Sequence, residues 1–248
     1  MVSRQQLRRR AHGLLVDLDD VAFFHPEAQQ AVANSAVRFV ADRVGVNRNE
    51  AVALNRHLYM THGHTLLGMR AELGLNVTLA EFNAAVYSSR TLQEVSCLTQ
   101  HPRTLARAAE MRRLVARMHC GDVGTYVFTN APRVWCDFAL REIGLARLFA
   151  PEQLLTSDTC YPGVDPNDII LKPSWLSYDL ATRCAGTSSI MFVDDSSRNL
   201  EAAPTAWRKY LMCNNGPPET AENKDATPIT HLDQVAAPVV SPASPHGW

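Results

Sequence analysis

The chain has 248 residues, of which 46% are hydrophobic and 20% charged, as in an ordinary folded protein. This length allows one large domain or a domain with a sizeable insertion. The 24 basic and 25 acidic residues leave a formal net charge of -1, which offers no general attraction to nucleic acid or to an anionic membrane. No apolar run approaches the length of a membrane span. We therefore expect neither a nucleic acid nor a membrane as a partner.

The six cysteines are widely spaced and form no C-x-x-C or Cys/His ligand pair. They are typical of reduced thiols in an intracellular protein, so we expect a cytoplasmic location. The nine histidines show no ligand spacing such as H-x-x-x-H, and we predict no zinc site.

The first predicted element is a strand within residues 13–21. Its apolar run lacks helical periodicity, which is typical of a parallel strand buried on both faces. Asp17 and Asp19 flank Leu18, so in extended geometry the two carboxylates leave the backbone on the same side. They could share a cation or a reacting group. The alternative is a strand that runs into an ordinary acidic turn.

From Glu27 to about His119 the pattern is helical, so a block of helices stands between the first predicted strand and the second. The interruption at Gly63 to Gly68 separates two of its helices, and Thr78 is a plausible N-cap in a capping box with Glu81. We interpret residues 24–119 as an inserted helical cap.

Strands and helices alternate after this insertion. The expected elements are a strand at 125–128, a helix at 133–143, a short strand and turn at 149–155, a helix at 175–185 and a strand at 189–193. Such alternation calls for a parallel sheet with crossover helices. We assign residues 1–23 and 120–236 to this α/β core and predict a mobile tail at 237–248, which has little to bury.

Polar residues follow three of the predicted strands. In a parallel sheet these strand ends share one edge, where open α/β folds place their sites. The residues gathered there, with a lysine from the intervening loop, are Asp17, Asp19, Thr129, Asn130, Lys172, Asp194 and Asp195. Carboxylates without His or Cys suit Mg²⁺, whereas a hydroxyl, backbone N–H groups and a lysine suit phosphate. The edge therefore predicts a cation site beside an anion site.

The order and spacing of these residues resemble the haloacid dehalogenase-like (HAD) superfamily of hydrolases. Asp17-x-Asp19-x-Val21 resembles its first motif, Thr129 the second, Lys172 the third and Asp194-Asp195 the fourth. The resemblance implies an α/β fold with a Rossmann-like, doubly wound parallel sheet and an inserted α-helical cap of the C1 type. It covers residues 14–213.

Within the superfamily, the chain resembles the branch that includes fungal and bacterial pyrimidine 5'-nucleotidases. The segments that carry this resemblance are Phe128–Ala131, Leu171–Pro173, Phe192–Asn199 and, in the cap, Tyr59-x-x-x-Gly63 followed by Gly68. It implies a small-molecule phosphomonoester as substrate, with UMP or CMP expected.

The resemblance also implies a role for each motif residue. Asp17 would be the nucleophile that forms an aspartyl-phosphate, and Asp19 the general acid and then the general base. Lys172 would be a catalytic residue that also binds phosphate, together with Thr129 and Asn130. The expected Mg²⁺ ligands are Asp17, the backbone carbonyl of Asp19, Asp194 and, in support, Asp195. Because a departing halide needs no proton, Asp19 favours a phosphatase over a dehalogenase.

Several questions stay open at this level. The substrate could instead be a sugar phosphate or phosphoglycolate, and the protein could be a non-catalytic binding or regulatory relative. Tyr59, His64 and Arg70 are candidate specificity residues, although Tyr59 also suits a core aromatic and Arg70 a solvated helix charge. We expect a monomer or a homodimer.

The chain departs from the nucleotidase branch at two places. Arg90-Thr91 stands where relatives often have Leu-Pro, and Pro204 should shorten the helix that follows the fourth motif. Trp135, Trp175 and Trp207 are interpreted as core or helix-packing residues.

Overall fold

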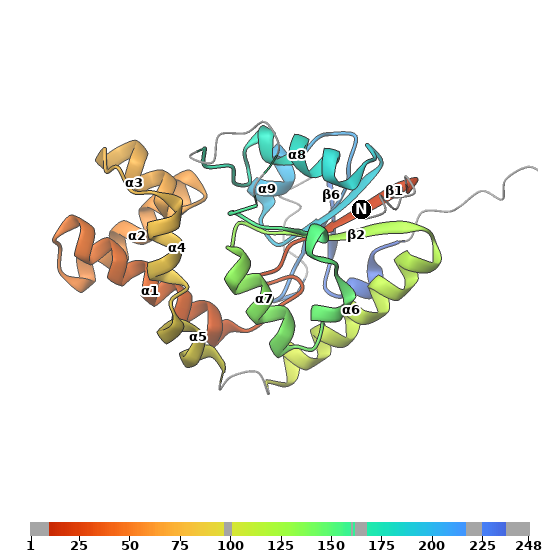
Figure 1. Ribbon diagram of the computed structural model, residues 1–248, viewed down its shortest axis with the longest axis horizontal. Helices are drawn as coiled ribbons and strands as arrows, with labels where there is room; N and C mark the ends of the chain where they lie inside the picture. Colours follow the sequence, from red (N-terminus) through yellow and green to blue (C-terminus); the bar gives the residue numbers. More distant parts are fainter. Residues whose placement is uncertain (1–9, 97–100, 160, 162–167, 217–224, 237–248) are drawn as a thin grey trace, which may run out of the picture.

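The computed structural model describes residues 10–96, 101–159, 161, 168–216 and 225–236. Its centre is a six-stranded sheet in the order β3-β2-β1-β4-β5-β6, and all neighbouring strands run parallel (Figure 1). The strands are β1 (His12–Val16), β2 (Val123–Phe128), β3 (Leu154–Leu155), β4 (Ile190–Asp194), β5 (Arg208–Met212) and β6 (Ala226–Ile229). The predicted α/β class with a parallel sheet is confirmed.

The first strand is central, as its apolar sequence predicts. Leu14, Leu15 and Val16 are fully buried, because β1 has a strand on each side and helices over both faces. Val16 lies in register with Val127 of β2 and with Val193 of β4. The residues that follow these three positions therefore emerge at the same edge of the sheet.

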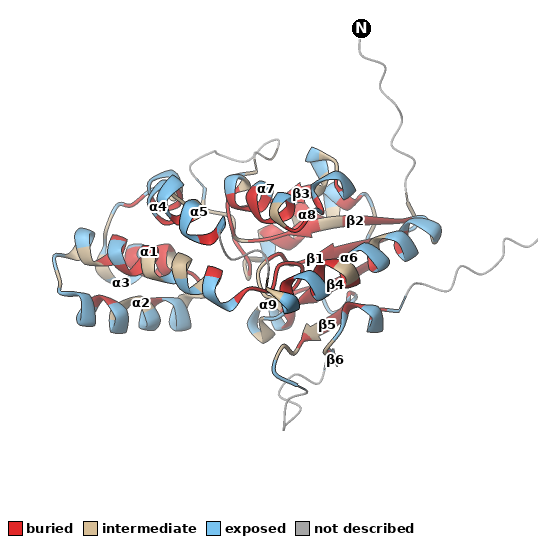
Figure 2. Ribbon diagram, turned by 90° about the horizontal axis from the view of Figure 1, so that it is seen from below, coloured by how far each residue is buried: buried red, intermediate tan, exposed pale blue. Residues whose placement is uncertain are grey.

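Helices cover both faces of the sheet. One face packs against α6 (Pro102–Cys120) and α7 (Arg133–Glu142) through a hydrophobic core that includes Met111 and Trp135. The other face packs against α8 (Trp175–Ala185) and α9 (Ser197–Ala202) through Tyr178 and Leu200. Figure 2 shows the buried strands between these layers.

A further group of helices forms a lobe beside the carboxyl ends of the strands (Figure 1). They are α1 (Pro26–Val44), α2 (Arg48–His62), α3 (Thr65–Leu73), α4 (Leu79–Val86) and α5 (Ser89–Ser96). The lobe has a hydrophobic core of its own, which includes Val40, Leu58 and Phe82. We call helices α1 to α5 the cap.

The domain boundaries stay a prediction: residues 24–119 for the cap, and residues 1–23 and 120–236 for the core. Within residues 24–119, helix α6 contacts β2 and the short 3-10 helix Leu232–Gln234, and its buried apolar residues belong to the hydrophobic core of the sheet. The helical periodicity of α6 resembles that of the cap helices, so the sequence does not indicate which layer it joins.

The glycine-bearing interruption in the cap has a clear structural reason. Gly63 ends α2 with φ of 76°, a left-handed conformation that favours glycine. At Gly68, a Cβ atom would lie 2.7 Å from the Cβ of Leu58, so only glycine allows α3 to approach α2 this closely. His64 caps the start of α3 by accepting a hydrogen bond from the backbone N–H of Leu66. The predicted capping box of Thr78 and Glu81 is confirmed at the start of α4.

Some sequence expectations differ from the structure. Strands β5 and β6 were not predicted, because β5 begins with two basic residues and β6 contains Pro228, which an edge strand tolerates. Trp175 is 74% exposed, so its interpretation as a core or helix-packing residue is wrong; Trp135 and Trp207 are buried as expected. Pro204 follows the end of α9 at Ala202, in agreement with the predicted short helix.

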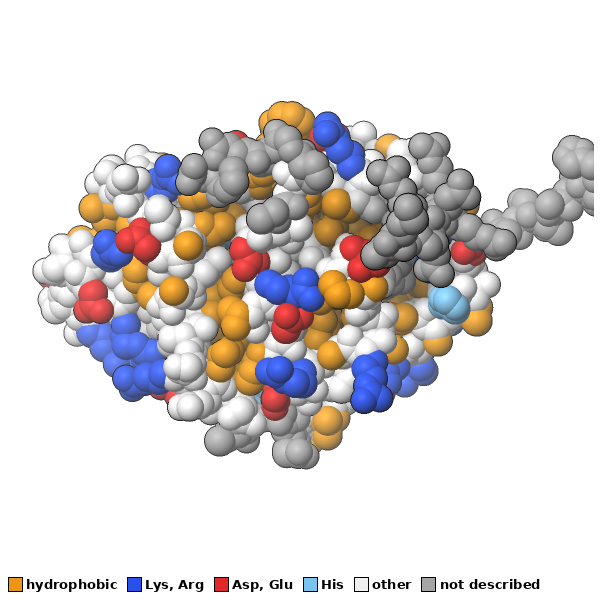
Figure 3. Space-filling model, viewed as in Figure 1, with side chains coloured by type: hydrophobic (Ala, Val, Ile, Leu, Met, Phe, Trp, Pro, Cys, Tyr) orange, Lys and Arg blue, Asp and Glu red, His pale blue; other side chains and the backbone are white. Residues whose placement is uncertain are grey.

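Other expectations concern segments outside the described residues. The predicted mobile tail, 237–248, lies there, as do Cys97 and Cys160. The four described cysteines, Cys120, Cys136, Cys184 and Cys213, are free thiols. No helix among the described residues is long and apolar enough to cross a membrane. On the face in Figure 3, basic and acidic side chains of the described residues are interspersed.

Candidate active site

A cavity of about 760 Å³ lies between the carboxyl ends of the strands and the cap. Its lining on the sheet side includes Asp17, Asp19, Thr129, Asn130, Lys172 and Asp195. Asp194, the remaining predicted site residue of the sheet edge, is outside the lining, fully buried and in contact with Lys172. The structure thus brings together all seven residues that the sequence placed at this edge.

Lys172 is the centre of the charged cluster. Its ammonium group is 3.0 Å from Oδ1 of Asp17 and 2.6 Å from Oδ2 of Asp194, and the residue is 1% exposed. Burial opposes the charge, but the two carboxylates outweigh it and raise the pKa of Lys172. The lysine therefore stays protonated and can bind a phosphate oxygen.

Asn130 fixes the backbone of Lys172. Its side-chain amide donates to the carbonyl of Lys172 and its amide oxygen accepts from the N–H of Lys172, both at 2.8 Å. The amide group of Asn130 has a second N–H besides the one that Lys172 accepts, so the phosphate contact of Asn130 stays a prediction. The Lys172–Pro173 peptide bond is cis.

Asp17 sits directly after β1 and is 8% exposed. Its Oδ1 accepts a hydrogen bond from the N–H of Leu18, 2.8 Å away, besides facing Lys172. Burial raises the pKa of Asp17 to about 7, and Lys172 opposes that shift. Charging Asp17 in this site therefore costs free energy, which a cation would offset.

Asp194 is held by several donors. The backbone N–H of Ser196 donates to Oδ1 at 2.9 Å, and the side-chain amide of Asn199 donates to both oxygens at 3.0 and 3.2 Å. Asn199 is a site residue to which the sequence reasoning gave no role, although it lies within the segment that carries the fourth motif. Asp194, Asp195 and Asp17 each offer a carboxylate oxygen, and the three atoms lie within 4.8 Å of one another.

Asp19 lies two residues after Asp17 and lines the cavity. The indole N–H of Trp135, on α7, donates to its Oδ1 at 2.9 Å. Burial raises the pKa of Asp19 to about 6, and this hydrogen bond acts in the opposite direction. No sequence signal distinguishes Trp135 from an ordinary core tryptophan, so its polar contact was missed.

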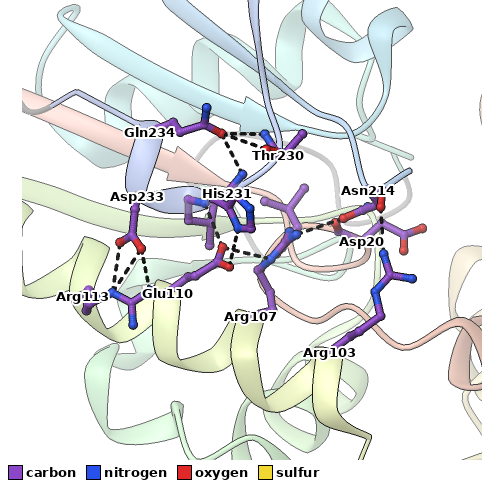
Figure 4. A network of polar contacts seen from close by, with 12 residues as sticks. Asp20, Arg103, Arg107, Glu110, Arg113, Asn214, Thr230, His231, Asp233 and Gln234 are labelled. Carbon is purple, nitrogen blue, oxygen red and sulfur yellow. Dashed lines mark hydrogen bonds and ion pairs between the residues drawn. The ribbon is translucent and has the colours of Figure 1, made fainter. Parts of the chain in front are cut away.

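A polar network supports the loop that carries Asp19 and Asp20 (Figure 4). Arg107 of α6 donates to the carbonyl of Val21 at 3.0 Å and to Oδ1 of Asn214 at 3.1 Å. The side chain of Asn214 donates in turn to the carbonyl of Asp20 at 2.8 Å. Asp20 has a positive φ of 59°, uncommon outside glycine, and these contacts hold it there.

Thr129 follows β2, and its hydroxyl oxygen accepts a hydrogen bond from the N–H of Ala131 at 3.1 Å. The hydroxyl hydrogen is therefore available to a ligand in the cavity. Thr129 is 4% exposed, so such a bond would form away from bulk water.

The cap supplies the opposite wall of the cavity. Of the predicted specificity residues, Tyr59 and His64 line it, whereas Arg70 is exposed on α3 and lies outside the lining. Tyr59 is 55% exposed and thus not the core aromatic of the alternative interpretation. The other cap residues of the lining include Gln29, Asn55, Arg56, Met60, Thr65, Phe82, Val86 and Tyr87.

His64 is a buried, uncharged group in this wall. It is 9% exposed and its ring lies against Phe82 with centroids 5.1 Å apart. Burial lowers the pKa of His64 to about 4. Since Nδ1 accepts from the N–H of Leu66, the ring proton belongs on Nε2.

Solved HAD-type hydrolases share this fold. A HAD phosphatase from Thermococcus onnurineus aligns with a TM-score of 0.52 and 13% identity, covering 89% of this chain and 94% of that one. A magnesium-bound HAD hydrolase, YfnB from Bacillus subtilis, aligns at 0.53 and 16%, covering 90% and 96%. A dehalogenase aligns at 0.53 and 17%, covering 90% and 94%.

These structural alignments establish the fold. They leave the reaction open, since a phosphatase and a dehalogenase both have this fold. No protein-family model matches the sequence, and no curated protein matches it. The choice of reaction therefore depends on the residues of the site.

Proposed function

We propose that the protein is a HAD-type phosphomonoester hydrolase in which Asp17 is the nucleophile and Asp19 the general acid and base. The observation that carries the proposal is the position of Asp17 at the cavity, with Lys172 3.0 Å from its Oδ1 and Asp19 on the same short loop. This arrangement provides a carboxylate nucleophile, a fixed positive charge and a second carboxyl group for proton transfer.

The acidic cluster fits a divalent metal ion. Three carboxylate oxygens within 4.8 Å of one another, with no nitrogen or sulfur ligand, match the preference of Mg²⁺ for oxygen. Asp17, Asp194 and Asp195 would hold the ion, with the carbonyl of Asp19 as the further ligand that the resemblance implies. A bound Mg²⁺ would neutralise the carboxylates and polarise the phosphate. The magnesium-bound relative supports this assignment.

In the first half-reaction, a carboxylate oxygen of Asp17 attacks phosphorus and the ester P–O bond breaks. Asp19 gives its proton to the departing alkoxide, so an alcohol leaves and an aspartyl-phosphate remains. Lys172 and the hydroxyl of Thr129 hold phosphate oxygens while negative charge develops on them.

In the second half-reaction, Asp19 is a carboxylate and accepts a proton from water. The resulting oxygen nucleophile attacks the aspartyl-phosphate, inorganic phosphate forms and Asp17 is regenerated. The same residue thus returns to its protonated state at the end of the cycle.

Asp19 also supports the choice of phosphate esters over carbon–halogen bonds. An alkoxide is a poor leaving group without a proton, whereas a halide leaves as the free anion. Asp19 lines the cavity beside Asp17, so this chain offers the acid that ester cleavage requires.

For the substrate, we propose a pyrimidine nucleoside 5'-monophosphate. The cap wall combines apolar side chains such as Phe82 and Val86 with the polar groups of Asn55 and His64. A flat heterocycle with carbonyl and amino groups matches this combination of apolar contact and hydrogen bonding. The nucleotidase-like motifs of the sequence support the same choice.

The test is phosphate release in the presence of Mg²⁺ from UMP, CMP, AMP, phosphoglycolate and several sugar phosphates. Asp17→Asn is the inactive control, and Asp137→Asn, an exposed carboxylate on α7, is the matched surface control. We expect the wild type and Asp137→Asn to release phosphate preferentially from UMP and CMP. Asp17→Asn should release no phosphate from any ester.

Two other outcomes distinguish the alternatives. Preference for a sugar phosphate or phosphoglycolate would retain the mechanism and replace the substrate. A folded wild type without activity on any ester would contradict the hydrolase proposal and favour a binding or regulatory protein.

A further inference from the structure

We propose that Trp135 is a positioning residue that orients the carboxyl group of Asp19 for proton transfer to the leaving group. The inference rests on the proposed function, since it assigns a supporting residue to its general acid. The observation behind it is the 2.9 Å hydrogen bond from the indole N–H of Trp135 to Oδ1 of Asp19.

An indole N–H donates hydrogen bonds and cannot accept them. Oδ1 of Asp19 therefore presents a lone pair to Trp135. Because the carbonyl oxygen of a carboxylic acid is a better acceptor than its hydroxyl oxygen, the contact favours a proton on Oδ2. The contact thus selects one of the two carboxyl oxygens as the donor to the leaving alkoxide and as the acceptor from water. It also restricts rotation of the carboxyl group before the substrate binds. Less conformational entropy is then lost when the group takes its reactive orientation.

The indole ring can serve this purpose because its own position is fixed. Trp135 is 1% exposed, and its ring contacts those of Phe23 and Phe138 at centroid distances of 5.8 and 5.7 Å. Phe23 lies on the loop that carries Asp19, whereas Phe138 lies one helical turn away on α7. The ring therefore joins this loop to α7.

The cap reaches the same ring. Tyr87, the C-terminal cap residue of α4, lines the cavity and lies 5.6 Å from Trp135 between ring centroids. Trp135 thus touches both a cap residue of the cavity wall and the general acid. Orientation of Asp19 then depends on a ring that is packed on one side by the cap.

The competing explanation is purely structural: a buried indole N–H needs an acceptor, and Asp19 happens to provide one. The two explanations differ in what loss of the N–H does to different leaving groups. An alkyl ester needs the acid, whereas 4-nitrophenyl phosphate has a stable leaving group that departs without a proton. General structural damage would slow both.

The experiment compares Trp135→Phe with the wild type, using kcat/KM for the best alkyl ester of the substrate panel and for 4-nitrophenyl phosphate. This parameter reports the steps up to departure of the leaving group. We expect the alkyl value to fall at least about tenfold more than the aryl value, a fraction of the 10²–10⁴ that a general acid contributes. Trp207→Phe, a buried tryptophan on the other face of the sheet, is the matched control and should leave the ratio unchanged.

Equal losses for both esters, or no loss, would overturn the proposal. Trp135→His, which keeps a ring N–H, should recover part of the alkyl activity. In an Asp19→Asn background, Trp135→Phe should not change the ratio further, and a further change would also overturn the proposal. Inactivity of the wild type on every ester would instead contradict the proposed function itself.

If Trp135→Phe does not fold, the indole N–H resonance of Trp135 in the intact protein provides the second measurement. We expect this resonance to shift between the wild type and Asp19→Asn, while that of Trp207 stays in place. An unchanged Trp135 resonance would overturn the proposal.

Discussion

The two walls of the cavity are built in different ways. On the sheet side, Asp17, Lys172 and Asp194 are buried, and each is held by two or more hydrogen bonds or ion pairs. On the cap side, His64, Phe82 and Val86 are also buried, but Tyr59 and Met60 are 55% and 63% exposed. The comparison indicates that the charged groups at the strand ends are fixed by several polar contacts each, while part of the cap wall keeps more freedom.

Few polar contacts among the described residues join the two walls. Arg198 donates to the carbonyl of Met60 at 2.8 Å, and Asn83 donates to the hydroxyl of Ser157 at 3.3 Å. The two parts also pack through apolar contacts such as that of Tyr87 with Trp135, but a small number of polar contacts is compatible with a cap that moves while the sheet edge stays fixed. The following predictions test this difference, beginning with the fixed wall.

Replacing Lys172 should have the largest effect. Lys172→Met leaves the carboxylates of Asp17 and Asp194 close together without their positive partner, and we expect loss of about 3–5 kcal/mol in the free energy of unfolding as well as loss of activity. Urea unfolding without Mg²⁺ measures the change. Arg183→Met, which removes an exposed ion-pair partner on α8, should cost under about 1 kcal/mol. Similar losses for both variants would contradict the preorganised cluster.

Binding of Mg²⁺ should stabilise the fixed wall. At a free concentration of one hundred times Kd, the free energy of unfolding should rise by about 2.7 kcal/mol. Asp195→Asn removes one proposed ligand and should reduce this gain, whereas Asp137→Asn should retain it. Thermal unfolding with and without Mg²⁺ measures the gain independently of catalysis. An equal gain in both variants would place the ion elsewhere.

Acid should weaken the cap through His64. Its pKa is about 4 in the folded protein and about 6.5 in the unfolded chain, so between these values the unfolded state binds more protons. The stability that neutral His64 contributes is therefore lost as the pH falls through this window, by about 2 kcal/mol between pH 7.5 and 5. Asp17 and Asp19, whose pKa values are raised, contribute in the opposite direction over the same window. The test is therefore the difference between two proteins: in urea unfolding at both pH values, the change in the free energy of unfolding should be more favourable to the acid side in His64→Gln than in the wild type. Equal changes in the two proteins would indicate that His64 is not desolvated.

The smallest effect is expected at the polar cap wall. Oδ1 of Asn55 accepts a hydrogen bond from Thr65 at 2.8 Å, which leaves its NH₂ group available to the substrate. Asn55→Ala should raise KM about three- to tenfold, the equivalent of one hydrogen bond of about 1 kcal/mol, with little change in kcat. Asn49→Ala, on the same helix but outside the cavity lining, is the control. Equal KM values for the two variants would show that Asn55 does not contribute to substrate binding.

The sequence was most informative where the residue pattern itself imposes the geometry. Parallel strands place the residues that follow them at one edge of the sheet, so the sequence alone groups Asp17, Thr129 and Asp194. The sequence also predicts where helices begin and end, as with the capping box at Thr78 and the short α9 before Pro204. The last two strands were not predicted, because β5 lacks a clear apolar pattern and β6 contains a proline.

The amino-acid sequence by itself thus determined the class of fold and the membership of the charged cluster, because strand periodicity and the ends of parallel strands are local properties. Only the tertiary structure decided that α6 joins the sheet, that Arg70 lies outside the cavity and that Trp135 binds Asp19. Each of these depends on which surfaces meet when the helices pack, and residues 116 positions apart, such as Asp19 and Trp135, carry no local signal of their contact.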